Sequence, residues 1–418
     1  MTQQHGTPQT TAAAKESAAA EATAATADAP GGLAPTAEVS VANAHPPEPT
    51  VIHTSEERIA VATQWQLMWW RYRKHKLALG GTIVLAAFYF VSLFADFFAY
   101  ADPQESDAQR SLMAPQAIHW VDKDSGSFGP HVYAFKGMRD PITFKRMYAL
   151  DMTKKIPVTF FGHGEPYNLF GFIPTDRHLI AVEGAKAGES LFLLGTDTQG
   201  RDLWSRLMFA TRTSMTIGLV SVALSLVLGV VLGGISGYFG GAIDSFIQRI
   251  IEILRSIPTI PLWMGLAAAL PGDWDVVKVY FAITIIISLI GWTELARVVR
   301  GRFISLKQED FVMAAELLGC SKTRIIFRHM VPSFISHIIA ATTLAIPAII
   351  ISETSLSFLG LGLRPPAISW GVLLQDAQNI QALVLSPWLL FPSIAVIVAV
   401  LAFNFMGDGV RDAADPYL

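Results

Sequence analysis

The chain has 418 residues, of which 52% are hydrophobic and only 16% charged, against about a quarter charged in an ordinary soluble domain. The net charge of −3 and the lack of a basic block give no indication of nucleic-acid binding. The single cysteine, Cys320, excludes an intramolecular disulfide and a cysteine metal cluster. Long apolar runs with so few charges predict an all-α integral membrane protein.

The N-terminal segment, residues 1–55, differs from the rest of the chain. It is rich in Ala, Thr, Pro and Glu, so ordering it would bury too little apolar surface to offset the lost entropy. It also lacks the basic start and apolar stretch of a secretory signal. We therefore expect a disordered tail, which the orientation given below places in the cytoplasm.

Six segments are long and apolar enough to cross the roughly 30 Å of a bilayer as helices. They are Leu77–Phe98 (within an N-terminal unit 56–98), Met215–Tyr238, Phe246–Leu270, Val276–Ala296, Ser336–Ser357 and Pro387–Met406. The third segment carries Arg249, Glu252 and Arg255 and then two prolines. We expect its first part to lie at a membrane surface or inside a bundle. Two further charges, Asp96 and Glu294, lie near predicted span ends, where they would reach water.

Basic residues set the predicted orientation. Lysines and arginines gather before the first span, in 71–76, and between the fourth and fifth spans, in 297–328. Because cytoplasmic loops carry an excess of these residues, both segments should be cytoplasmic, and that requires the third span. Six spans then leave the N- and C-termini in the cytoplasm.

The segment 99–192, between the first two spans, is predicted to be external. It contains short apolar runs such as "IPVTFF", separated by Gly and Pro, which are typical of short strands and turns. Loops of this length translocate largely regardless of charge. We expect a small folded insertion that is held by packing.

The same insertion raises an alternative function, that of a membrane-anchored external enzyme or binding module. The carboxylates and imidazoles of this segment, whose side chains are potential metal ligands, are His119, Asp122, Asp124, His131, His163, Glu165 and His178. Their spacing matches no metal-ligand pattern, so we predict no metal site.

The stretch "LLGTDTQGRDLWSR" (193–206) places Gly195 and Gly200 at the spacing of a phosphate-binding loop. Such a loop needs Lys and then Ser or Thr after the second glycine. Arg201 and Asp202 stand there instead, so we predict a tight turn and no nucleotide site.

That turn opens an external amphipathic segment, 193–213. We expect Asp197 to cap the turn and Asp202 to begin a helix along the membrane surface. In this arrangement Leu203, Leu207 and Phe209 face lipid or the bundle, whereas Arg201, Arg206 and Arg212 face water or headgroups.

Glycines recur every four residues in the second span, at Gly229, Gly233 and Gly237. Small residues at this spacing let helix backbones approach closely in lipid. We therefore predict that this helix packs tightly against another span.

The segment 297–332, between the fourth and fifth spans, is predicted to form two short helices joined by a turn. Helix Gln308–Leu318 would place Phe311, Ala314, Ala315 and Leu318 on one face. Gly319 suits a left-handed helix end, Ser321 can cap Lys322–His329, and Pro332 would end it. From the residues alone, this is either a rigid knob that receives force from a soluble partner or an ordinary amphipathic surface loop.

The stretch "DFVMAAELLGCSKTRIIFRHMVP" resembles the signature loop of ABC-transporter permease subunits. Ala314, Ala315, Gly319, Ile325 and Pro332 match that signature, and Met313 replaces its glutamate. The stretches beginning at Leu194, Ser352 and Pro387 resemble the second-subunit type of dipeptide and oligopeptide permeases, and the matches together cover most of 193–416.

The resemblance implies the type I importer permease fold, with a core at 214–407 and a cytoplasmic end at 408–418. It implies peptide import through the inner membrane of a bacterium, with a second permease subunit, two cytoplasmic ATPases and an external solute-binding protein as partners. ATP and Mg would bind the ATPases, so this chain would bind no cofactor or metal and hold no catalytic residue. The ATPase-coupling residues that the loop implies are Asp310, Phe311, Ala314, Ala315, Glu316, Gly319, Ile325, His329 and Pro332.

Glu353 in the fifth span is a candidate for the substrate pathway, because a carboxylate inside a membrane is a functional candidate by default. It would meet a peptide ammonium group. Its neighbours in "SETS" favour instead a structural role, since their hydroxyls can satisfy a buried charge. An ion-driven secondary transporter is a further alternative, but the spans offer few of the ionisable residues that it needs.

Overall fold

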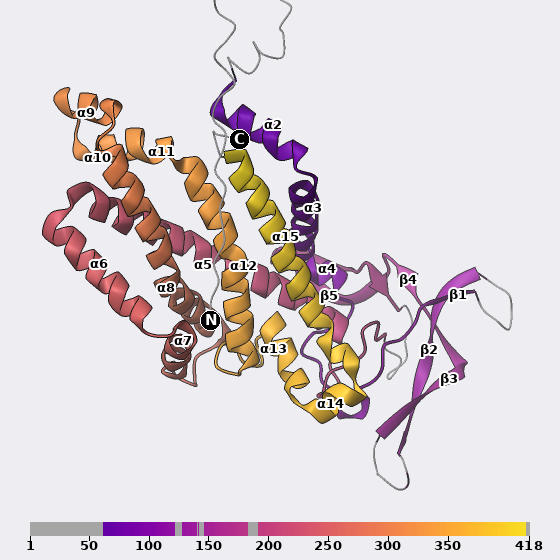
Figure 1. Cartoon of the computed structure of the whole chain (residues 1–418). Coiled ribbons are helices and arrows are strands. Elements are labelled where there is room, and N and C mark those ends of the chain that lie inside the picture. Colours follow the sequence, from indigo (N-terminus) through magenta and orange to yellow (C-terminus); the bar gives the residue numbers. More distant parts are fainter. Residues whose placement is uncertain (1–61, 122–127, 140, 142–145, 183–190, 415–418) are drawn as a thin grey trace, which may run out of the picture. The chain divides into compact units, whose positions relative to one another are not determined.

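The fold is taken from a computed structural model, which describes residues 62–121, 128–139, 141, 146–182 and 191–414. The predicted tail at 1–55 lies outside these residues. Five helices in the described chain are long and apolar enough to cross a membrane (Figure 1). They are α3 (Lys76–Leu93), α5 (Leu203–Phe239), α8 (Val276–Leu306), α12 (Ile335–Phe358) and the continuous stretch of η4 (Pro387–Leu390) and α15 (Phe391–Ala414). Each of them overlaps a predicted span.

The predicted third span is not one straight helix. α6 (Gly241–Ser256) and α7 (Thr259–Ala268) meet at a bend of 88°. Pro258 disfavours the helical conformation of the residue before it, and Ile257 is accordingly extended, at φ −93° and ψ 130°. Counted as one broken span, the pair raises the number of crossings in the described chain from five to six.

α5 corrects the prediction for 193–213. The expected surface helix and the second span form a single helix of 37 residues, because no proline or glycine interrupts the chain between Leu203 and Thr216. Asp202 is the N-cap as predicted, and its side chain accepts a hydrogen bond from the Ser205 N–H at 2.7 Å.

The C-terminal helix is also longer than predicted. α15 continues past Met406 to Ala414, and Ala413 packs with Tyr72 and Ala78. Ala78 lies in α3, and Tyr72 lies in α2 (Gln64–Lys74), a helix that begins with a capping box at Thr63. The described residues after Met406, 407–414, are therefore partly packed against α2 and α3.

α5 and α8 touch along the predicted glycines. A Cβ placed on Gly233 would lie 2.5 Å from the Ala296 carbonyl oxygen, and one on Gly237 would lie 2.7 Å from that of Arg300. At Gly229 the nearest atom would be the Leu295 Cβ, at 2.9 Å. Only glycine allows this approach. α12 in turn packs against α5, α8 and α15, and α3 packs against α5 and α15.

The insertion between α3 and α5 contains short strands, as predicted. β1 (His119–Val121), β2 (Phe128–Arg139) and β3 (Arg146–Pro157) form an antiparallel sheet in that order. β4 (Thr159–Phe160) pairs with β7 (Ile180–Ala181), and β5 (His163–Leu169) pairs with β6 (Ile173–Arg177). The core of the insertion consists of four buried apolar residues, Val132, Ile156, Val158 and Leu191.

Short helices complete the described chain. They are α4 (Ala95–Phe98), η1 (Ala108–Arg110), α9 (Asp310–Leu317), α10 (Lys322–Arg324), η2 (Ile325–Met330), α11 (Val331–Ser333), α13 (Trp370–Leu374), η3 (Gln375–Gln378) and α14 (Ile380–Leu385). No group of three His, Cys, Asp or Glu side chains able to hold a metal ion occurs within the described ranges, and Asp122 and Asp124 fall outside them.

Candidate functional site

A cavity of ≈ 620 Å³ lies among α5, α6, α7, α8 and α12. Most of its wall is apolar, but two charged side chains reach it, Arg255 from α6 and Glu294 from α8. Hydroxyls line it from several helices: Ser225, Thr259, Thr293, Thr342 and Ser352. This cavity could not be predicted from the sequence, because it forms only where five helices separated in the chain come together.

Neither Arg255 nor Glu294 forms an ion pair within the described part of the chain, where the ion pairs join other residues. Glu294 was predicted near a span end, but α8 continues for 12 residues beyond it to Leu306, so it lies well inside the helix. Trp263, also on the wall, has a buried indole N–H without a hydrogen-bond acceptor. Both Arg255 and Glu294 are exposed, so the cavity offers accessible charges of both signs to a ligand.

Glu353 occupies a different environment. It is fully buried, and its carboxylate accepts hydrogen bonds from Ser357 at 2.8 Å and from Ser214 of α5 at 3.3 Å. Ser214 also accepts the Trp370 N–H at 3.1 Å. The cavity wall includes the neighbouring Ser352 but not Glu353. The carboxylate therefore lies at a junction of α5, α12 and α13, where its hydrogen bonds come from Ser214 and Ser357.

The first part of the predicted loop, 297–306, continues α8, and residues 310–333 form a compact knob of four short helices, α9, α10, η2 and α11 (Figure 1). Gly319 ends α9 with φ +71°. Its N–H bonds to the Glu316 carbonyl and the Cys320 N–H to that of Ala315, which is the Schellman arrangement. Ser321 caps the next turn by accepting the Arg324 N–H. This confirms the predicted helix–glycine–helix geometry.

The buried face of α9 differs from the prediction. Val312 and Ala315 are buried, at 0% and 6% exposed, whereas Phe311 is 43% and Leu318 is 83% exposed. Val312 joins Phe303 and Ile325 in the core cluster beneath the knob. α9 thus turns another face inward, because burial here follows the supporting ends of α5 and α8 and not the largest apolar residues.

The remaining coupling residues are distributed over the knob. Ala315 and Ile325 are buried within it, and His329 is half-buried. Asp310, Phe311, Ala314, Glu316, Gly319 and Pro332 are exposed. Pro332 does not end the helix; it lies in the first turn of α11, and the chain changes direction at Phe334, at φ −127° and ψ 19°.

The most exposed apolar side chains of the knob are not among the predicted coupling residues. Leu317 is 89% exposed, Leu318 is 83% and Phe327 is 59%. Apolar side chains clustered on a surface mark an interaction site. The signal in the sequence was the Leu-Leu pair directly before the helix-ending Gly319.

The C-terminal end of α5 is joined to the knob from two sides. The Tyr238 hydroxyl donates to Glu316 of α9 at 3.1 Å. The Lys322 ammonium lies 5.3 Å from the centre of the Phe239 ring, a distance suited to a cation–π contact. The knob is therefore in direct contact with α5.

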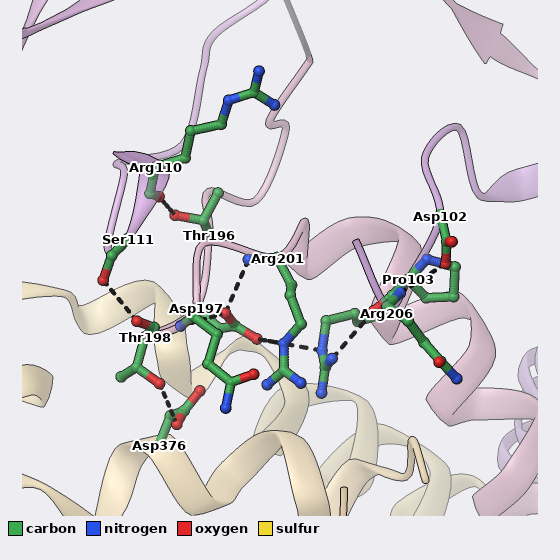
Figure 2. A network of polar contacts seen from close by, with 12 residues as sticks. Asp102, Pro103, Arg110, Ser111, Thr196, Asp197, Thr198, Arg201, Arg206 and Asp376 are labelled. Carbon is green, nitrogen blue, oxygen red and sulfur yellow. Dashed lines mark hydrogen bonds and ion pairs between the residues drawn. The ribbon is translucent and has the colours of Figure 1, made fainter. Parts of the chain in front are cut away.

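At the opposite end, the turn 195–202 enters a buried polar network (Figure 2). The Asp197 carboxylate accepts the Gln199 and Arg201 N–H groups at 2.9 and 3.0 Å, which confirms it as the turn's cap. The Arg201 Nε also donates to it at 2.7 Å, and the Arg206 Nε lies at 3.4 Å. Both guanidinium groups are buried, contrary to the prediction that they face water.

The same turn binds neighbouring segments together. Thr198 donates to Asp376 of η3 at 2.7 Å, and Ser111 donates to the Thr198 carbonyl at 2.7 Å (Figure 2). A Cβ on Gly195 would meet the Met113 carbonyl at 2.5 Å, and Gly200 has φ +78°. The glycines thus serve this packing, and the carboxylate between them makes the turn unsuited to phosphate.

Comparisons with known proteins agree with this architecture. Residues 229–418 match the family model for the "binding-protein-dependent transport system inner membrane component", and residues 63–115 match the "N-terminal TM domain of oligopeptide transport permease C". Oligopeptide transport system permease protein OppC of Escherichia coli K12 is 39% identical over 59% of this chain and 79% of its own length. The proteins of that name from Bacillus subtilis (39% identity, 54% of this chain, 71% of theirs) and Haemophilus influenzae (38%, 59% and 76%) are similar to a comparable degree.

Proposed function

The chain belongs to the OppC-like permeases, the multi-pass inner-membrane components of binding-protein-dependent ABC transport systems, and from this premise we propose that it forms half of a membrane pathway for oligopeptides. A second permease subunit would complete the pathway. An external solute-binding protein would deliver the peptide, and two ATPases would drive its passage. Permeases of this family hold no ATPase site of their own.

The observation that carries the proposal is the cavity with Arg255 and Glu294 on its wall. A free peptide carries an ammonium group at one end and a carboxylate at the other. Unpaired charges inside a membrane are costly, so two of opposite sign on an otherwise apolar wall suit a ligand that supplies both counter-charges. The pathway charges are therefore assigned to these two residues in place of Glu353.

We further propose that the knob is the contact with one ATPase, with the N- and C-termini on the same cytoplasmic side. Leu317, Leu318 and Phe311 offer an exposed apolar surface to a groove on that partner. The buried Ala315 and Ile325 would support this surface without touching the partner. Closure of the ATPases on ATP would shift the knob, and Tyr238 would pass the shift to α5.

The test is peptide uptake by liposomes that contain the complete complex. Without a gradient, added ATP and the binding protein should drive uptake, whereas an ion gradient alone should not. Uptake that needs only an ion gradient would identify a secondary transporter instead. Peptide cleavage without uptake would favour the external-enzyme alternative.

The same assay tests the two charges. Glu294→Gln should raise the KM for a free peptide several-fold but leave an N-acetylated peptide unaffected, because the latter has no ammonium group. Arg255→Gln should likewise raise the KM for a free peptide several-fold but leave a C-amidated peptide unaffected, because the latter has no terminal carboxylate. Arg249→Gln is the matched control, since Arg249 lies on the same helix but pairs with Glu252 and is absent from the cavity wall. An equal effect of all three variants would refute the assignment.

A further inference from the structure

An aromatic chain runs from α3 into the insertion. The ring centroids of Phe90 and Phe94 lie 4.8 Å apart, and Phe94 lies 5.4 Å from Phe170. Phe170 opens the turn between β5 and β6 and lies 6.4 Å from Phe172 on the far side of that turn. The tip of this hairpin is thereby joined, ring to ring, to the end of a membrane-spanning helix.

A second aromatic contact runs beside the first. Phe97 of α4 lies 5.9 Å from Phe161, which stands just before β5. Phe161 and Phe170 both have left-handed backbones, at φ 57° and 54°, a conformation that is unfavourable for a bulky residue. The chain thus accepts local strain at the two positions from which these rings project.

The rings are largely uncovered by the rest of the chain. Phe172 is 74% exposed, Phe161 is 60%, Phe170 is 44% and Phe90 is 55%. Such a contiguous aromatic surface costs free energy in water. We therefore expect an apolar partner to cover this aromatic surface.

We propose that the β5–β6 hairpin is a membrane-interface anchor, whose Phe170 and Phe172 enter the outer margin of the bilayer beside α3, with Phe161 next to them. The occupant is lipid because the surface continues directly into α3. Only 22% of the apolar window of α3 is buried, the smallest share among the five candidate spans of the described chain. Leu93 and Phe90, on its last two turns, are both 55% exposed.

A charged pair marks the level of the bilayer surface at this place. Arg212 of α5 lies 2.5 Å from Asp96 of α4. In the sequence, Asp96 stands between Phe94 and Phe97. Phenylalanine rings on interfacial segments bury at this level, at the boundary between headgroups and acyl chains. The polar residues His163 and Asp176, which pair at 2.7 Å at the other end of the hairpin, lie on the watery side in this arrangement.

The test is site-directed spin labelling of the full chain in liposomes. Cys320, the only native cysteine, is first replaced by serine. A nitroxide is then attached at Phe172→Cys, with Phe90→Cys as the lipid reference. Met138→Cys is the water reference, because Met138 is 54% exposed on the separate β2–β3 hairpin. Power saturation compares collisions with oxygen, which enriches in lipid, and with a water-soluble nickel chelate.

The anchor predicts that Phe172→Cys shows a high ratio of oxygen to nickel collisions, shifted from the Met138→Cys value toward that of Phe90→Cys. A ratio equal to that of Met138→Cys would place the hairpin in water and overturn the proposal. Low accessibility to both reagents would mean that a protein partner covers the hairpin, and would also overturn it. Ile173→Cys, exposed in the same turn, serves as a second probe if Phe172→Cys fails to fold.

Discussion

Asp244 of α6 accepts hydrogen bonds from both the Nε and the Nη2 of Arg300 in α8, each at 2.6 Å. The Ser236 hydroxyl of α5 donates to the same carboxylate at 2.5 Å. One carboxylate thus fixes the start of the bent α6–α7 pair to the two helices that support the knob. Such bidentate geometry is specific to arginine.

Arg300→Lys should therefore destabilise the protein, although it keeps the charge. We expect a double-mutant cycle of Arg300→Lys and Asp244→Asn to give a coupling free energy of about 1 kcal/mol or more. The exposed pair Arg249–Glu252 is the control and should give at most about 0.5 kcal/mol. Unfolding in detergent measures both, and equal couplings for the two pairs would contradict the structural role.

Gly319 should be needed for its backbone conformation and not for space. Its φ is +71°, and nothing lies within 4 Å of an added Cβ. Gly319→Val should strain the turn by about 1–2 kcal/mol and lower the peptide transported per ATP hydrolysed while the complex still assembles. Gly301→Ala is the control, because Gly301 is equally open but has an ordinary φ. Normal coupling in Gly319→Val would refute the prediction.

Glu353 should prove structural. Glu353→Ala leaves the Ser214 and Ser357 hydroxyls without their buried acceptor, and this should cost about 1–3 kcal/mol of unfolding free energy. Glu353→Gln keeps an acceptor and should stay close to wild type. The KM for peptide should be unchanged in the folded fraction of either variant. A several-fold rise in KM for a well-folded Glu353→Gln would return this residue to the pathway.

Gly233 should tolerate no side chain. A single added methyl group would meet the Ala296 backbone oxygen at 2.5 Å, so Gly233→Ala should force α5 and α8 apart and destabilise the protein by about 1–3 kcal/mol. Gly265→Ala in α7 meets nothing within 4 Å and should be neutral or stabilising, since alanine is the better helix former. Thermal unfolding of the two variants in parallel measures the difference. Equal unfolding midpoints for Gly233→Ala and Gly265→Ala would contradict the prediction.

Asp202 should make stability depend on pH. Burial raises its pKa to about 6, against about 3.9 in an unfolded chain. The folded state therefore holds this proton more firmly, so the group's contribution to stability is greatest below about pH 4 and is lost as the pH rises through about 6.

Asp202→Asn removes the titration and keeps a side chain suited to the helix N-cap. The variant should lose the fall in unfolding midpoint that the wild type shows between about pH 4 and pH 6. Asp176→Asn is the control of opposite sign, because the hydrogen bond from His163 lowers the pKa of that exposed carboxyl. An unchanged pH profile in Asp202→Asn would contradict the assignment.

Much of the fold was predictable because its determinants are local. A helix needs about 20 apolar residues to cross a bilayer, so a long apolar run such as Ile335–Phe358 is recognisable from the sequence alone. Caps and turns are equally local: Asp197, Ser321 and Gly319 act within a few residues of their own positions. The strands of the insertion followed from its short apolar runs.

The predictions that were wrong concern residues whose surroundings come from other segments of the chain. Arg206 was expected in water because an isolated arginine prefers it, but the fold supplies Asp197 and the Pro103 carbonyl, at 3.4 and 3.2 Å. The inward face of α9 depends on what lies beneath it. Glu294 was interpreted as a helix-end charge, since the apolar run ends there although the helix does not.

The length of α5 has a mechanical consequence. Its 37 residues form an unbroken helix of about 55 Å. One end begins at the Asp202 cap beside the Asp197 network, and the other contacts the knob through Tyr238 and Phe239. If this helix tilts as one body, a shift of its end at the knob also moves its end at the Asp197 network, and the two ends of the bundle are coupled through backbone alone.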